Sequence, residues 1–227
     1  MGFNIAIDGP AGAGKSTIAK QAAKELSFIY IDTGAMYRAI GLYAERKGLN
    51  GENEEQVCKA AEETDVKILY HQGERYVYLN GEDVTEAIRR ERIGEMASKV
   101  SVFAGVRAHL LSLQRKIAAE SNVIMDGRDI GTCILPDADV KIYLTASDEV
   151  RAERRYAELS AKGITAEYEQ VLEDIRQRDY RDMHREVAPL KQAEDAVLLD
   201  TSDMTIAEAV HAVVALAEKA GARKASI

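Results

Sequence analysis

Residues 9–17 read Gly9-Pro10-Ala11-Gly12-Ala13-Gly14-Lys15-Ser16-Thr17, and the fold can be worked out from this stretch. It fits the pattern G-x-x-x-x-G-K-[ST] of a phosphate-binding loop. Glycines let the backbone wrap closely around a phosphate, so that its N–H groups point at the oxygens. The lysine reaches the β and γ phosphates, and the serine hydroxyl is placed to bind Mg²⁺. We therefore expect the stretch to hold phosphate groups, with Ser16 as the metal ligand.

The residues on either side supply the context that the motif requires. Residues 3–8 form a short apolar run typical of a buried strand, and residues 15–26 repeat apolar side chains at helical spacing. A strand, a loop and a helix in that order favour a phosphate loop over a glycine-rich turn with an incidental lysine.

Four more apolar runs are followed by helical or loop sequence, as strands of a parallel sheet would be. They are residues 28–31, 122–126, 140–144 and 196–200. Alternating strands and helices predict an α/β fold with a parallel five-stranded sheet flanked by helices. Ligands of such sheets bind at the carboxyl ends of the strands, where the phosphate loop also lies.

Two segments interrupt this alternation. Residues 66–84 change to a period of two, with a turn at 71–74, which predicts a small antiparallel insert. Residues 161–165 break a helical region that is rich in arginine on both sides. We therefore expect one domain over 1–227, with an insert at 32–100 and a helical lid at 151–170.

The lid region carries arginines at helical spacing in an otherwise acidic chain. Arg151, Arg154 and Arg155 follow one another at i, i+3 and i+4, which places three guanidinium groups on one helix face. A second long helix is expected to carry Arg178, Arg181, Asp182 and Arg185. Such a run is usually a solvated face, but two arginine clusters on either side of one turn favour a phosphate ligand.

Composition excludes several classes of protein. The 30 basic and 38 acidic residues give a net charge of −8, which argues against a general nucleic-acid partner. Cys58 and Cys133 lie far apart and suggest neither a disulfide framework nor a zinc site. No apolar run is long enough to span a bilayer. We expect a cytoplasmic monomer that binds small molecules and has no membrane partner.

The chemistry follows from a phosphate loop beside many arginines. The guanine-binding pattern N-K-x-D is missing, which disfavours a GTPase. Phosphoryl transfer needs positioning and stabilisation of charge, which cations supply. An acceptor that is already anionic needs no general base, because neutralising its repulsion from the donor is enough.

Five stretches resemble bacterial cytidylate kinases. They are Ile7-Asp8-Gly9-Pro10, Asp32-Thr33-Gly34-Ala35-Met36-Tyr37-Arg38, Leu79-Asn80-Gly81-Glu82-Asp83-Val84, Asp126-Gly127-Arg128-Asp129-Ile130-Gly131-Thr132, and Arg178-Asp179 through Arg185-Glu186-Val187-Ala188-Pro189-Leu190. The resemblance implies the P-loop fold of nucleoside monophosphate kinases, with ATP and Mg²⁺ as cofactors and CMP and dCMP as substrates.

The resemblance also assigns roles by position. It implies that residues 9–17 bind ATP and that Thr33, Arg38, Arg128 and Arg185 contact the monophosphate. Ser98, Arg107 and Asp129 resemble the residues that read cytosine, and Arg178 and Asp182 those that contact the sugar. We expect the phosphoryl group in transfer to be neutralised by the cations Lys15, Arg128, Arg154, Arg181 and Arg185.

Two other hypotheses stay open at this point. A kinase for UMP or AMP on the same fold would differ only in the residues that read the base, and a panel of substrates separates it. A regulatory protein that binds nucleotide without turnover would keep the loop but need no arginine hairpin.

Overall fold

Five strands form the central sheet, in the order β2-β6-β1-β7-β8. Their bounds are β1 (Asn4–Asp8), β2 (Ile29–Asp32), β6 (Val123–Gly127), β7 (Val140–Thr145) and β8 (Val197–Asp200). The first strand lies at the centre and pairs in parallel with both β6 and β7. Strands β2 and β6 lie on one side of β1, and β7 and β8 lie on the other. Ligands of open α/β sheets bind beside such a reversal of strand order. The predicted α/β fold with a parallel sheet is confirmed.

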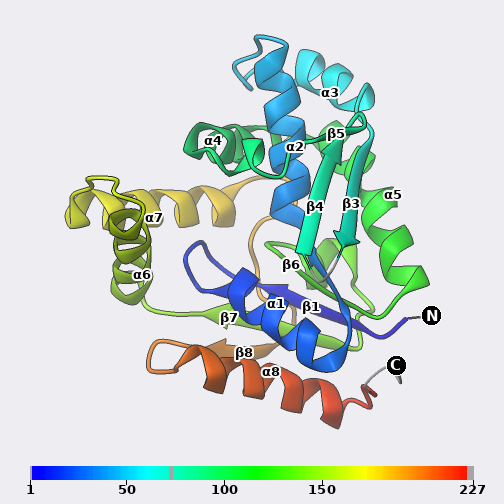
Figure 1. Ribbon diagram of the computed structural model, residues 1–227, viewed down its shortest axis with the longest axis vertical. Coiled ribbons are helices and arrows are strands. Elements are labelled where there is room, and N and C mark those ends of the chain that lie inside the picture. The colour runs from blue at the N-terminus through cyan, green and yellow to red at the C-terminus, as the bar shows by residue number, and fades with distance from the viewer. Residues whose placement is uncertain (1, 72–73, 224–227) are drawn as a thin grey trace. The chain divides into compact units, whose positions relative to one another are not determined.

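The computed structural model (Figure 1) describes residues 2–71 and 74–223. Contacts divide the chain into two units. The first unit contains the sheet and runs to Ile31 and again from Ile117 onward, whereas the second unit is Asp32–Lys116. The unit that carries the phosphate loop and the unit that carries the insert are described separately below.

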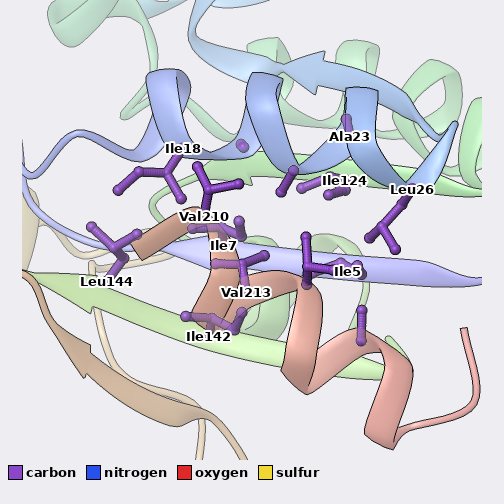
Figure 2. Close-up of a cluster of buried hydrophobic side chains, with 14 of the residues drawn as sticks. Ile5, Ile7, Ile18, Ala23, Leu26, Ile124, Ile142, Leu144, Val210 and Val213 are labelled. Carbon is purple, nitrogen blue, oxygen red and sulfur yellow. The ribbon is translucent and has the colours of Figure 1, made fainter. Parts of the chain in front are cut away.

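The core of the first unit lies between the sheet and two helices, α1 (Lys15–Leu26) and α8 (Ile206–Lys219). Figure 2 shows Ile5 and Ile7 of β1 below Ile18 of α1, with Val213 of α8 below Ile7 in the same cluster. Each such buried aliphatic side chain stabilises the fold by about 1.5–3 kcal/mol. Because α1 is held against the sheet along its length, the loop that precedes it has two fixed ends.

Two further helices, α6 (Asp148–Ala161) and α7 (Tyr168–His184), form the hairpin predicted as a lid. They pack on each other through a small core of their own, made by Ala152, Leu159, Val171, Leu172 and Ile175. The second helix ends at His184, so the prediction that Arg185 lies within it is wrong by one residue. The chain then turns through Ala188, at a φ of 49°, into Pro189, which cannot continue a helix.

The second unit contains the predicted antiparallel insert. Its elements are α2 (Thr33–Arg46), α3 (Glu54–Glu62), β3 (Val66–His71), β4 (Glu74–Leu79), β5 (Glu82–Asp83), the 3₁₀ turn η1 (Ala87–Arg89), α4 (Glu91–Val100) and the start of α5 (Ala104–Glu120). The three strands pair antiparallel in the order β3-β4-β5. The turn predicted at 71–74 falls partly on 72–73, which lie outside the described residues.

Single residues set two helix boundaries in this unit. Helix α2 begins at Thr33, because the Asp32 side chain caps it by accepting from the Ala35 backbone N–H. The turn η1 and helix α4 are separate, since Arg90 adopts an extended conformation between them. Within the described part of the chain, no helix combines the length and apolar character needed to span a bilayer.

Candidate active site

The phosphate loop connects β1 to α1 and depends on glycines at two places. Gly9 has a φ of 151°, and a Cβ there would lie 1.9 Å from the backbone oxygen of Leu144. Gly14 adopts a left-handed conformation as the N-cap of α1, with a φ of 87°. An L side chain is disfavoured at both positions. The N-terminus of α1, with its unpaired N–H groups and positive dipole end, therefore faces the loop.

Lys15 lies inside the loop and is buried, with 6% of the residue exposed. Its Nζ donates to the backbone oxygen of Pro10 at 2.6 Å. Burial lowers the pKa of Lys15 well below its usual value, and the positive charge of Arg128 lowers it further. An anion at this position would raise the pKa of Lys15 again, because its negative charge would offset the repulsion from Arg128 and stabilise the charged ammonium group.

Ser16 points at the carboxyl end of β6. Its Oγ donates to Asp126 Oδ2 at 2.8 Å, and the Tyr30 hydroxyl donates to the other oxygen of the same carboxylate at 3.1 Å. The sequence prediction did not assign a role to Asp126. The sequence signal that could have identified Asp126 is an acidic residue at the end of an apolar strand, on the edge of the sheet where the loop lies.

Asp8, the last residue of β1, holds the turn that follows β6. Its two carboxylate oxygens accept from the N–H groups of Ile130 and Gly131, each at 2.7 Å. Those residues begin the π-helical turn η2 (Ile130–Ile134). Burial raises the pKa of Asp8 to about 6 although the two backbone hydrogen bonds act in the opposite direction. The turn that carries Arg128 and Asp129 is thereby anchored to the strand before the phosphate loop.

Arg128 and Asp129 each pair with a residue at the end of α7 instead of with each other. Arg128 Nε donates to Asp182 Oδ2 at 2.8 Å, and Arg185 Nη2 donates to Asp129 Oδ1 at 3.3 Å. Burial raises the pKa of Asp182, but the charge and hydrogen bond of Arg128, together with the charges of Arg178 and Arg185, outweigh burial and leave that pKa below its usual value. Two arginine–carboxylate pairs therefore join the end of β6 to the end of α7.

The arginines on the hairpin have different environments. Arg154 Nη2 donates to the backbone oxygen of Thr201 at 2.7 Å, and its Nη1 approaches the backbone oxygen of Ala13 at 3.5 Å. Arg155 pairs with Glu158 on the exposed side of α6. Arg181 is exposed on α7 and has no ion-pair partner among residues 2–71 and 74–223. Of the predicted catalytic arginines on the hairpin helices, the structure therefore places Arg154 beside the phosphate loop.

The predicted residues of the second unit lie on three of its helices. Thr33 is buried at the N-terminus of α2, and Arg38 is half-buried one turn later. Arg107 of α5 donates to the backbone oxygen of Ser101 at 3.2 Å and lies 5.6 Å from the centre of the Tyr37 ring. The Ser101 hydroxyl donates to the backbone oxygen of Ser98 at 3.0 Å.

The structure thus brings the predicted residues together in two groups. One group surrounds the phosphate loop and the end of β6, and comprises Lys15, Ser16, Arg128, Asp129, Arg154, Arg178, Asp182 and Arg185. The other group lies in the second unit, where Ser98 and Arg107 meet around Ser101 and Thr33 and Arg38 share α2. In the first group, cations and carboxylates alternate around a loop suited to phosphate.

Comparisons with known proteins agree with this arrangement. The family model described as cytidylate kinase matches residues 5–219. The cytidylate kinase of Caldicellulosiruptor saccharolyticus is 50% identical over 94% of this chain and 95% of its own length. That of Caldanaerobacter subterraneus is 54% identical over 92% of each chain. Among solved structures, an uncharacterized protein from Eubacterium ventriosum superposes with a TM-score of 0.54 at 11% identity, over 96% of this chain and 99% of its own, which is a likeness of fold alone.

Proposed function

The chain belongs to the cytidylate kinase family, and we propose on that basis that it transfers the γ-phosphoryl group of ATP to CMP and dCMP, forming ADP with CDP or dCDP. The observation that carries the proposal is the gathering of Lys15, Arg128 and Arg178 beside the phosphate loop, with Lys15 buried against the Pro10 oxygen and Arg128 held by Asp182. Burial lowers the pKa of Lys15, and the positive charges of both arginines lower it further, so these cations repel one another. A donor and an acceptor that are both anionic relieve that repulsion when they bind.

Each cation has a part in the transfer. Lys15 binds the β and γ phosphates of ATP within the loop, and Arg154 neutralises charge from the side of Ala13. Arg128 and Arg185 bind the phosphate of the acceptor, whose oxygen is already ionised and needs no general base. They are held for that task by Asp182 and Asp129, so little reorganisation is needed when substrate enters.

The resemblance to cytidylate kinases assigns the remaining substrate contacts. Thr33 and Arg38 bind the monophosphate, and Arg178 with Asp182 contacts the sugar. Ser98, Arg107 and Asp129 read cytosine, which offers an exocyclic amine as donor and two ring acceptors. The base contacts are assigned to these residues by the resemblance, and the carboxylate, hydroxyl and guanidinium that they offer match that pattern of donors and acceptors.

Mg²⁺ fits the oxygen atoms beside the loop. Mg²⁺ binds one or two protein oxygens together with phosphates and waters. Ser16 Oγ and the Asp126 carboxylate lie 2.8 Å apart and are both hard ligands of this kind. No group of three or more His, Cys, Asp or Glu side chains suited to a metal occurs in the described part of the chain, consistent with a metal that arrives with ATP. When bound, the ion would neutralise charge on the phosphates.

A panel of acceptors tests the proposal. ADP formation should require both ATP and Mg²⁺, and it should be faster with CMP and dCMP than with UMP or AMP. Faster turnover of UMP or AMP would support the alternative of a different monophosphate kinase, which the family match does not favour. ATP binding without turnover of any monophosphate would support a regulatory protein instead. We also propose that the enzyme acts as a monomer, which sedimentation in the presence of substrates tests.

A further inference from the structure

Arg151 of α6 is buried and directed at the phosphate loop. Its side chain is 4% exposed, and all three guanidinium nitrogens donate to protein oxygens. Nε donates to the backbone oxygen of Ala146 at 3.0 Å, and Nη2 to the Asp148 carboxylate. Nη1 donates to the backbone oxygen of Ala11 at 2.9 Å. With its nitrogens used in this way, Arg151 acts on the loop and not on substrate.

Asp179 of α7 contacts the same loop residue from the other helix of the hairpin. Its Oδ1 accepts from the Ala11 backbone N–H at 3.4 Å, and its Oδ2 accepts from Arg151 Nη1 at 2.5 Å. Its side chain is 10% exposed. The peptide groups on both sides of Ala11 are therefore held by one ion pair, which itself joins α6 to α7.

The backbone of the loop also lies against the backbone of α6. A Cβ on Gly12 would lie 3.2 Å from Arg151 Cβ and 3.3 Å from the Arg151 backbone oxygen. The loop and the helix thus lie so close beside the ion pair that a side chain at position 12 would be crowded.

We propose that Arg151 and Asp179 are positioning residues that hold the phosphate loop, through Ala11, in the conformation that accepts ATP. A loop without these contacts samples other conformations, and the apparent affinity for a ligand falls in proportion to the fraction that remains competent. Chemistry after binding is expected to change less, because both side chains act on the loop through the backbone of Ala11. This inference rests on the proposed function of the loop in binding ATP.

Steady-state kinetics on Arg151→Lys, Asp179→Asn and the double variant test the proposal. Lysine keeps the positive charge but lacks the planar fork that reaches Ala11, Ala146 and Asp179 together. Loss of a hydrogen bond from a charged group is expected to raise KM for ATP about tenfold or more. KM for CMP, measured at saturating ATP, should stay near that of the unaltered protein. The double variant should lose less than the two single losses combined, because both residues act on Ala11.

Lys162→Met is the matched control. Lys162 also forms an ion pair within the hairpin, with Glu158, but both side chains are about half exposed at 58% and 48%. Its removal should leave the KM for ATP unchanged. An unchanged KM for ATP in Arg151→Lys, with only a lower melting temperature, would show that the pair is a structural anchor and overturn the proposal. Equal rises in KM for ATP and CMP would also overturn it.

The Asp179→Asn variant and direct titration with ATP cover two ways in which the kinetic test could fail. If Arg151→Lys does not fold, Asp179→Asn carries the test, because it is close in shape to the native residue. If the unaltered protein binds ATP but turns over no CMP, the proposed function fails. Direct calorimetric titration with ATP then still decides whether the two residues position the loop.

Discussion

Replacement of Asp182 by asparagine is expected to weaken kcat/KM for CMP more than for dCMP. Asp182 is buried near the end of α7, and its Oδ2 accepts from Arg128 Nε at 2.8 Å. From the resemblance to cytidylate kinases we propose that the same carboxylate contacts the sugar. Since only CMP has a 2′-hydroxyl, a carboxylate that accepts from this group distinguishes the two substrates.

Two energies must be separated in this experiment. Breaking the pair leaves the charge of Arg128 poorly compensated, which costs up to about 3–5 kcal/mol of stability for a fully buried pair. The side chains here are 20% and 10% exposed, so the cost lies toward the lower end of that range. Any effect of this cost on activity is the same for CMP and dCMP. The lost hydrogen bond between sugar and carboxylate is worth about 1.5–3 kcal/mol and falls on CMP alone.

The expected result is therefore a roughly tenfold or greater change in the ratio of kcat/KM values for CMP and dCMP. ADP release is measured for both substrates at saturating ATP, below the melting temperature of the variant. Asp174→Asn is the control, because Asp174 lies on the same helix but is exposed and accepts from Gln170 at 2.8 Å. Equal losses on CMP and dCMP would refute the reasoning and leave Asp182 as a structural partner of Arg128.

Three further changes test other parts of the site. Lys15→Ala should lower kcat by about two orders of magnitude or more while the protein stays folded, and near-normal turnover by a folded variant would remove its assigned role. Asp129→Ala should narrow the preference for CMP over UMP, because UMP, which lacks the amine, would no longer leave a carboxylate without a donor. An equal loss of activity on both substrates would make Asp129 structural or catalytic. Asp8 has a pKa of about 6 in the folded protein against 3.8 ordinarily, so the folded state binds this proton more tightly and stability falls as pH rises from about 4 to 6. Asp8→Asn should remove up to about 3 kcal/mol of that fall in the free energy of unfolding, which urea unfolding measures at each pH. If the free energy of unfolding differs between the variant and the unaltered protein by the same amount at every pH, the assignment is contradicted.

The phosphate loop and the sheet were predictable because their signals are local. The spacing of Gly9, Gly14 and Lys15 describes a backbone path within nine residues. Apolar runs and helical spacing likewise depend on neighbours a few positions away. The antiparallel insert was predicted for the same reason, since alternation with a period of two is visible within one hairpin.

Helix boundaries were less accurate, because they depend on single contacts. The start of α2 at Thr33 is set by the Asp32 cap. The end of α7 at His184, one residue earlier than predicted, precedes a turn in which Arg185 Nε donates to the backbone oxygen of Ala188 at 2.7 Å. Helical periodicity continues through such positions and does not show where a competing hydrogen bond ends the helix.

Local sequence patterns are enough to predict the loop, the order of strands and helices along the chain, and the arginine-rich character of the hairpin. The role of each charged residue depends on contacts that form when the chain folds. The three arginines at i, i+3 and i+4 on α6 have different partners. Arg151 donates to the backbone oxygen of Ala11, Arg154 donates to that of Thr201, and Arg155 forms an exposed ion pair with Glu158.

The partners that shape the site are distant in sequence. Arg128 and Asp182 are 54 residues apart, Ser16 and Asp126 are 110 apart, and the two ends of the contact between Asp8 and Ile130 are 122 apart. Helical and strand periods relate only residues on the same element. Which carboxylate meets which cation depends instead on how the ends of β1, β6 and α7 converge, and that convergence is set by packing of the sheet and its helices.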